Sequence, residues 1–563
     1  MSAPLISYQP LTPEGYREPR LRLLDNPILI AQARRQLRKR QASQSVALHL
    51  LLGVLVAFGA SQITASDGAH WAWARNLLSW AILFTLYFRG SSALSAAVLS
   101  ERDGGSFTFF RTSPLSSLSV AVGYLLGAPS RAYLSALALA PAWLVCATQA
   151  GASPLEVMGG LLALIGGALT FHSVTLAFAL SGSRGAQRVA SLFLLWIPFF
   201  FAEPLNAAGL HTLSHITPKP LLNALGLTFW SEHLTAARVL LFHLPLSTLA
   251  YTLIVQGLVV GASLWVATRR VERDAQPIVS RAGGLALLVA LTTLVAGVDL
   301  NPHALSPTAT LSAYGGGLPG GVALLALCAL CAIGLLLLST PTLIAARRAM
   351  ARAARDGRSP RLSWWLEGAS LRPFTGLLIL YVLGAFTAHT LLHFGSGGLR
   401  FALEAGLWPP LLSCAAALIS ISGLSESFSL RRGRLNYALS LSASLSALFL
   451  LPLLGALLAA SLSARDLIEP IGSLSPLYAL AYAAARLSRG VAGDAFPSEF
   501  EAFSQPLYFA LSLLTGLVSG WLGYQKAEAL RAGIATELKA QGKETAQGVT
   551  LTAEAEVGAR GAK

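Results

Sequence analysis

Charged residues are scarce in this sequence. Only 12% of its 563 residues are charged, and Asp and Glu together number 26. Soluble domains carry about 25% charged residues, so this chain has about half the charge that a soluble surface uses. It is also 54% apolar, with a mean hydropathy of +0.60. These values exclude an ordinary soluble protein and predict an all-α polytopic membrane protein.

Motifs for hydrolysis or redox chemistry are also missing from the sequence. It contains no Gly-rich loop followed by Lys-Ser/Thr, no HExxH and no GxSxG. The four cysteines lie inside apolar runs, and the Cys328-x-x-Cys331 pair has no His or acidic neighbour. We therefore expect no enzymatic activity, no catalytic residue, no metal site and no cofactor on this chain.

Apolar runs recur at the length of about 20 residues that crosses a hydrocarbon core of roughly 30 Å. They do not alternate with polar residues, as the strands of a membrane β-barrel do. We predict about twelve spans, at about 45–65, 74–96, 131–150, 155–182, 188–206, 246–268, 283–300, 319–345, 374–395, 402–424, 437–461 and 505–525.

These spans divide the chain into five parts. A polar arm (1–44) precedes a first six-helix half (45–268), a basic connector (269–282), a second six-helix half (283–525) and a polar tail (526–563). About four fifths of the 41 Lys and Arg fall in the arm, the tail and the connectors on their side of the membrane. The positive-inside rule therefore puts both termini in the cytoplasm. We expect the membrane to be a bacterial inner membrane. The net charge of +15 is explained by these loops, and we expect no nucleic acid partner.

The two halves share a similar layout. Corresponding spans begin about 240 to 260 residues apart, and in each half a long outward connector separates the fifth and sixth spans. Each connector contains Pro-Leu followed by an apolar half-length helix, at 220–230 and at 475–488. Because six is even, such halves would be parallel repeats related by an axis along the membrane normal. The alternative is the rough agreement in spacing that any chain of twelve spans shows.

Polar residues inside the spans are few. His172 and Gln256 lie within spans, and His389 and His393 lie one turn apart in the ninth span. Such residues are costly in a membrane and often functional. A packed, hydrogen-bonded histidine is the simpler interpretation of His172, and two histidines without a third ligand do not define a metal site.

The segment from Ser100 to Leu126 is neither a span nor a plain loop. It begins with three charged residues and a Gly-Gly pair, continues with the aromatic residues Phe107, Phe109 and Phe110, and then has Arg111. Aromatic side chains beside a few charges are typical of a short helix at a membrane surface. Such a helix either binds a partner or rests on lipid.

Two stretches resemble the ABC-2 type of ABC transporter permease. Between their second and third spans, these proteins have an acidic, Gly-Thr-containing segment that ends in Thr-x-Pro-Leu-Ser and leads to Gly-Lys. This chain has Glu101, Asp103, Gly105 and Ser106, then Thr112-Ser113-Pro114-Leu115-Ser116 and Gly123. The family's N-terminal Asn-Pro-x-Leu motif and its basic residues correspond to Asn26, Pro27, Leu29, Arg34 and Arg38. The departures are Gln32 for Glu, Tyr124 for Lys and Ser106 for Thr.

The resemblance implies an exporter permease that is driven by separate ABC ATPase subunits, which would bind the ATP and Mg²⁺. It also implies a set of partner-coupling residues: Glu101, Gly105, Phe107, Phe109, Phe110, Arg111, Pro114 and Leu115. We expect a second contact at Trp364 and Trp365 in the connector at 347–372. Membrane lipid and an unidentified transported substrate are the other expected partners.

Two other functions stay open. An ion-coupled secondary transporter also has twelve spans in parallel halves, but it should carry acidic residues at mid-membrane, where this sequence has none. An enzyme or assembly protein that acts on lipid-linked substrates should have paired acids or histidines in an outward loop. Its only candidates here are Asp494, Glu499 and Glu501, which a solvated loop explains better.

Overall fold

The computed structural model places most of the first half of the chain and selected helices of the second. The described residues are 26–38, 40–63, 69–113, 115–181, 211–224, 238–241, 244–272, 279–297, 328, 331–336, 339–340, 346–348, 351, 371–385, 387–388, 408–430 and 506–561. They form two compact units. Residues Met1–Gly151, Phe171–Leu192 and Ser263–Glu272 belong to the first unit, and the remainder to the second.

Five helices in the described part of the chain are long and apolar enough to cross a membrane. They are Arg40–Ser61, Ala69–Asp103, Ser130–Gln149, Pro154–Ser181 and Thr248–Glu272. Each coincides with a span predicted from the sequence, and the chain is mostly helical, as expected of a helical membrane protein. The predicted spans at 188–206 and 437–461 lie outside the described residues.

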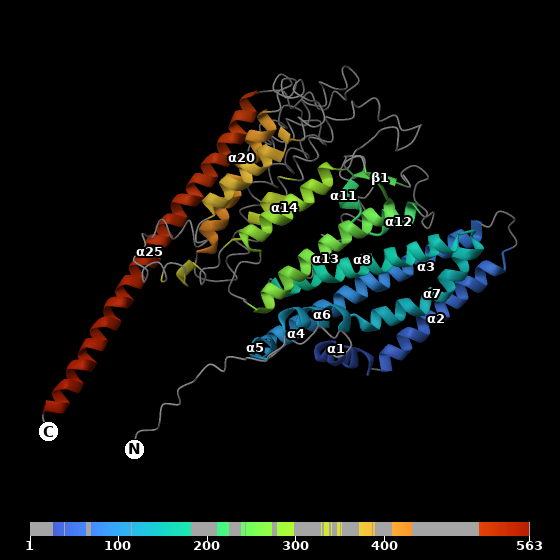
Figure 1. Ribbon diagram of the computed structural model, residues 1–563, viewed down its shortest axis with the longest axis horizontal. Coiled ribbons are helices and arrows are strands. Elements are labelled where there is room, and N and C mark those ends of the chain that lie inside the picture. The colour runs from blue at the N-terminus through green and yellow to red at the C-terminus, as the bar shows by residue number, and fades with distance from the viewer. Residues whose placement is uncertain are drawn as a thin grey trace, which may run out of the picture. The chain divides into compact units, whose positions relative to one another are not determined.

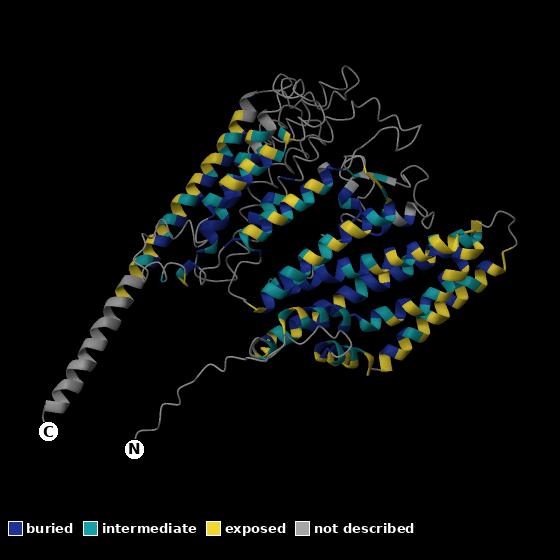
Figure 2. Cartoon of the chain, viewed as in Figure 1, coloured by how far each residue is buried: buried dark blue, intermediate teal, exposed yellow. Residues whose placement is uncertain are grey.

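The first unit is built from consecutive helices (Figure 1). They are α1 (Pro27–Leu37), α2 (Arg40–Ser61), α3 (Ala69–Phe84), the π-helix η1 (Thr85–Gly90), α4 (Ser91–Asp103), α5 (Ser106–Thr112), α6 (Ser117–Gly127) and α7 (Ser130–Gln149). α2, α3 and η1 pack on α7, and α1 packs on α6. The outward face of α2 carries exposed apolar side chains such as Leu48, Leu55 and Phe58, as a lipid-facing helix should (Figure 2).

The second predicted span is longer than the sequence suggested. α3, η1 and α4 form one helix of 35 residues that ends at Asp103. Glu101 therefore lies on the last turn of this helix and not in a loop. Gly105, with a φ of 75°, then turns the chain into α5. This left-handed conformation is readily open to glycine, which accounts for Gly105.

The π-helix η1 provides a hydrogen-bond partner for His172. Leu86 lies in this π-helix, and His172 Nε2 lies 2.9 Å from its carbonyl oxygen. His172 Nδ1 lies 2.7 Å from the Tyr133 hydroxyl. A Cβ at Gly90 would lie 2.3 Å from the imidazole, so the glycine makes room for the ring. His172 is a buried histidine with both ring nitrogens bonded, as the simpler interpretation expected.

The second unit contains most of α8 and α13 and the later helices. The bounds are α8 (Pro154–Ser181), α11 (His211–Ser214), α12 (Lys219–Ala224), β1 (Arg238–Leu241), β2 (Leu244–Ser247), α13 (Thr248–Glu272), α14 (Arg281–Ala296), α20 (Trp408–Ser429) and α25 (Pro506–Gly561). β1 and β2 pair in an antiparallel hairpin with Arg238 opposite Ser247, which an all-α expectation missed. α12 covers the start of the expected half-helix at 220–230. The expected half-helix at 475–488 lies outside the described residues.

Small residues bring α20 and α25 into close contact, and the two helices run side by side (Figure 1). A Cβ at Gly423 would lie 2.2 Å from the carbonyl oxygen of Gly520. A Cβ at Gly520 would lie 2.7 Å from the carbonyl oxygen of Ile419. Glycine at these positions allows the two backbones to touch, which is how helices commonly associate in lipid.

Candidate partner-docking site

The site begins with Asn26, which caps α1. Its Oδ1 accepts hydrogen bonds from the backbone N–H groups of Ile28 and Leu29, at 3.0 and 3.3 Å. Pro27 follows at the first helical position, where no N–H is needed. Asn26 Nδ2 also donates to the Ser119 carbonyl of α6 at 2.7 Å. The Asn-Pro pair therefore starts α1 and attaches it to α6.

Two glycines one turn apart on α6 receive α1. A Cβ at Gly123 would lie 2.7 Å from the Cβ of Ile28, and a Cβ at Gly127 would lie 2.8 Å from the carbonyl oxygen of Leu29. A side chain at either position would push the helices apart. Gly123, which the family resemblance singled out, is thus explained by close helix packing.

Glu101 is the centre of the site. Gln32 of α1 donates to its Oε1, the Tyr124 hydroxyl of α6 donates to its Oε2, and Arg35 lies 3.6 Å from Oε1. Both neutral donors are buried, and the Glu101 side chain is 18% exposed. Gln32 and Tyr124 are two of the three positions that depart from the family pattern, and they meet at one carboxylate. The carboxylate of Glu101 therefore accepts hydrogen bonds from two neutral donors.

The hydroxyl of Tyr124 remains a donor over the whole physiological range. Burial raises the pKa of Tyr124 far above its ordinary value, and the hydrogen bond and negative charge of Glu101 raise it further. The positive charge of Arg35 opposes this only in part. The phenol therefore stays protonated, and its bond to the carboxylate persists.

The aromatic residues of α5 divide between the core and the surface. Phe107 is 6% exposed and packs on Tyr124 with ring centroids 5.8 Å apart. Phe110 and Leu115 are partly buried against the same core. Phe109 is 67% exposed. Of the three phenylalanines expected to enter a partner's groove, Phe109 is therefore the one that faces outward.

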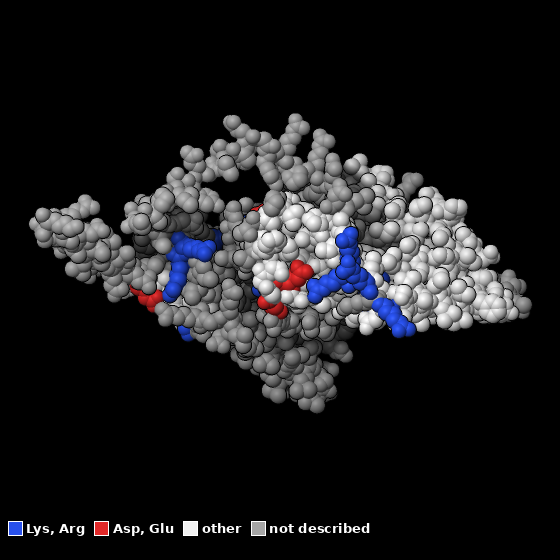
Figure 3. Space-filling model, turned by 90° about the horizontal axis from the view of Figure 1, so that it is seen from below, with Lys and Arg blue, Asp and Glu red and all other residues white. Residues whose placement is uncertain are grey.

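Other predicted positions are placed only in part. Arg34 and Arg38 are exposed on α1, and Figure 3 shows Lys and Arg side chains gathered on the face seen from below. The backbone of Arg111 is helical. The Arg111 side chain is not described. Four other predicted positions also lie outside the described residues: Pro114, Trp364, Trp365 and His389. Gln256 is buried on α13, and a Cβ at Gly166 would lie 2.3 Å from its Oε1.

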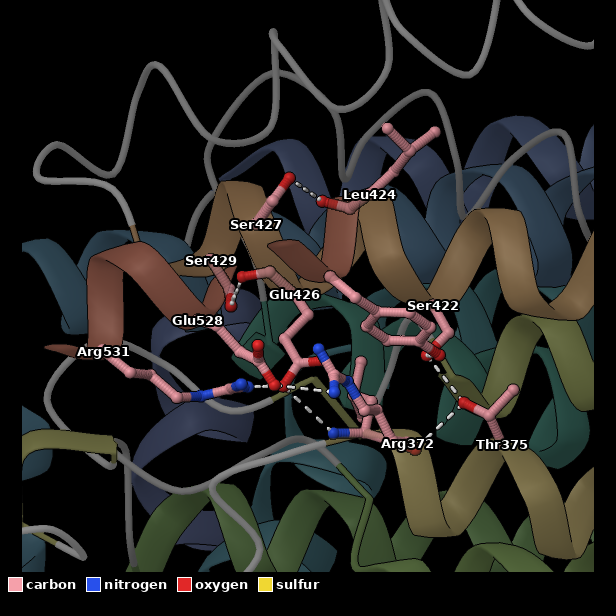
Figure 4. Close-up of polar contacts among 11 residues, drawn as sticks. Arg372, Thr375, Ser422, Leu424, Glu426, Ser427, Ser429, Glu528 and Arg531 are labelled. Carbon is pink, nitrogen blue, oxygen red and sulfur yellow. Dashed lines mark hydrogen bonds and ion pairs between the residues drawn. The ribbon is translucent and has the colours of Figure 1, made fainter. Parts of the chain in front are cut away.

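A second carboxylate centre was missed by the sequence analysis. Glu426 of α20 is fully buried, contacts the guanidinium of Arg531 from α25, and accepts a hydrogen bond from the Leu371 N–H at 3.3 Å (Figure 4). Beside it, Arg372 pairs with Glu528 at 2.7 Å. The available signal in the sequence was Glu426 in SGLSESFS, directly after the predicted span at 402–424. A solvated loop also explains an acidic residue at this position.

Within the described ranges, no group of three or more His, Cys, Asp or Glu side chains could hold a metal ion. Both carboxylates connect helices that are distant in sequence. No protein-family model, curated protein or solved structure matches this chain.

Proposed function

We propose that this chain is the transmembrane permease subunit of an ATP-driven ABC exporter of the ABC-2 type. A separate ATPase subunit binds at α5 and the exposed Phe109. The observation that carries the proposal is the convergence at Glu101. The two stretches that resemble the family are 69 residues apart at Gln32 and Glu101, yet they form one cluster.

The proposal gives the cluster a mechanical role. α5 is joined to the long α3–α4 helix through Gly104-Gly105, and Phe107 fixes it to α6. Glu101 in turn binds α1 and α6, which lead directly into α2 and α7. Force on α5 when the ATPase closes on ATP would therefore reach three predicted spans together. An exporter needs this coupling, because the ATP site and the substrate path are on different subunits.

Two contacts support the proposed repeat of two parallel six-helix halves. In the first half, Arg270 of α13 donates to the carbonyls of Leu180 and Ser181 at the end of α8, at 3.4 and 3.3 Å. In the second half, Arg531 of α25 contacts Glu426 near the end of α20. The predicted fourth and sixth spans are thus joined in both halves by an arginine of the sixth. In the proposed topology both termini are cytoplasmic, and substrate passes between the halves.

Co-purification tests the proposal. A tagged chain should retain an ABC ATPase, expected from an adjacent reading frame. Phe109→Asp should reduce the retained ATPase by more than about tenfold, because a charge replaces an apolar anchor at the contact. Leu37→Asp is the matched control, since Leu37 is an exposed apolar residue of α1 and not of α5. The proposal is wrong if the wild-type chain retains no ATPase, and the docking site is wrong if Phe109→Asp retains as much as Leu37→Asp.

A further inference from the structure

Two arginines from different helices converge on the first turns of α2. Arg89 of η1 donates to Ser45 Oγ at 3.0 Å, and Arg131 of α7 donates to Gln41 Oε1 at 3.4 Å. Gln41 and Ser45 are one helical turn apart. Ser45 also bonds Ser135, one turn beyond Arg131, at 2.9 Å. These contacts place both guanidinium groups against one short stretch of α2.

The three helices reach this point at the same membrane level. The Ala69–Asp103 helix has 35 residues, or about 52 Å at 1.5 Å per residue, which exceeds a hydrocarbon core of roughly 30 Å. Arg89 lies about 30 Å along it from Ala69. Gln41 and Arg131 are the second residues of α2 and α7, which run in from the same side. With Ala69 at one boundary of the hydrocarbon core, the cluster would lie at the other, between hydrocarbon and headgroups.

Among the described residues, no acidic side chain pairs with Arg89 or Arg131. In the part of the chain that the structure describes, the polar partners of Arg89 and Arg131 are a neutral hydroxyl and a neutral amide. Their partners Ser45 and Gln41 lie one turn apart on α2, so the two like charges repel each other. An anion that binds between them would relieve this repulsion, and phosphate suits arginine because it accepts two parallel hydrogen bonds.

Apolar surface continues from the cluster into the membrane. Leu48, Leu51 and Leu55 of α2 are exposed, as are Leu134 and Leu137 of α7. We propose that Arg89 and Arg131, with Gln41 and Ser45, bind the phosphate of an anionic phospholipid whose acyl chains lie along α2 and α7. The inference needs only that these helices cross a membrane, and it is independent of the proposed ATPase partner.

Native mass spectrometry of the detergent-purified chain tests the site, with phosphatidylglycerol and phosphatidylcholine offered in equal amounts. The wild-type chain should retain phosphatidylglycerol preferentially. An arginine near an anionic headgroup contributes about fivefold in affinity, so Arg89→Gln with Arg131→Gln should weaken the preference roughly 30-fold. The control variant, Arg34→Gln with Arg38→Gln, removes the same charge from exposed positions of the N-terminal helix. It should keep the preference for phosphatidylglycerol.

Three results would overturn the site. They are a wild-type chain without preference, a double variant that keeps the preference, or equal losses in the α1 control. If the double variant does not fold, Arg131→Gln alone should lose about fivefold. Inorganic phosphate separates the two sources of the same chemistry: if it displaces the lipid or stabilises the chain equally well in detergent, the ligand is a soluble anion and the lipid proposal is wrong.

Discussion

Glu101 in the first unit and Glu426 in the second are both carboxylates that join three separate segments, but their donors differ. Glu101 has two neutral donors in direct contact and Arg35 at 3.6 Å. Glu426 has Arg531 in direct contact. The Glu101 side chain is 18% exposed, whereas those of Glu426 and Arg531 are 0% and 2% exposed. A carboxylate that keeps some contact with water can be held by neutral groups, while a fully buried one needs a cation.

The largest effect is expected at the fully buried pair of Glu426 and Arg531. Glu426→Gln leaves Arg531 buried beside Arg372 and Arg281, whose positive charges already lower the pKa of Arg531 together with burial. We expect a loss of about 3–5 kcal/mol in unfolding free energy, measured by denaturant titration in detergent. The matched control is Glu528→Gln, which breaks a half-exposed pair with Arg372 and should cost about 0–1 kcal/mol. Equal losses in the two variants would contradict the distinction between the centres.

At the Glu101 centre, Tyr124→Phe removes one donor to a charged acceptor. We expect a loss of about 1.5–3 kcal/mol, smaller than for Glu426→Gln because Gln32 and Arg35 remain. The pKa of Tyr124 is raised above its unfolded value of about 10. The contribution of the phenol is therefore fully present below pH 10 and is lost as the pH rises through the raised pKa. Between about pH 6 and pH 9, the difference between wild type and variant should stay constant. A difference that shrinks within that interval would mean that the phenol ionises.

The close contact between α1 and α6 can be tested by adding a methyl group at a packed glycine and at a glycine on an open helix face. Gly123→Ala should cost about 1–3 kcal/mol, because the added methyl group meets Ile28 and the Asn26 cap. Gly59→Ala is the matched control, since a Cβ there meets nothing within 4 Å, and it should be neutral or stabilise by up to about 1 kcal/mol. Thermal unfolding of the two variants in the same detergent gives the comparison. If both variants behave alike, α1 does not pack on α6 as closely as described.

The smallest effect concerns Gln32 and Tyr124, two of the three departures from the family that the chain resembles. Gln32→Glu puts a second carboxylate beside Glu101 and should destabilise the chain, whereas adding Tyr124→Lys to it supplies a balancing cation. We expect the double variant to be more stable than the sum of the single effects by about 1 kcal/mol, since neighbouring residues couple by 0.5–3 kcal/mol. Additive effects in the double-mutant cycle would show that Gln32 and Tyr124 are not coupled to each other by Glu101.

The candidate site was predictable in part. The Asn-Pro motif, the short helix after Gly105 and the five membrane-length helices follow from local rules of capping, glycine conformation and apolar length. Which aromatic residues of α5 are buried and which are exposed could not be predicted from these rules. Phe107 and Phe109 are two residues apart in an apolar stretch, and only the position of Tyr124 decides which of them is buried. Burial of His172 was expected, but its partners Leu86 and Tyr133 lie on other helices and could not be predicted.

The sequence by itself determined that this chain belongs in a membrane and where five of its helices lie, because bilayer thickness acts on runs of neighbouring residues. Only the tertiary structure decided which donors meet at Glu101 and Glu426 and that Arg89 and Arg131 share one turn of α2. Those pairings join residues on different helices, and their register depends on close contacts such as Gly123 with Ile28. Such contacts leave no periodic trace in the sequence, because each depends on the packing of two helices at once.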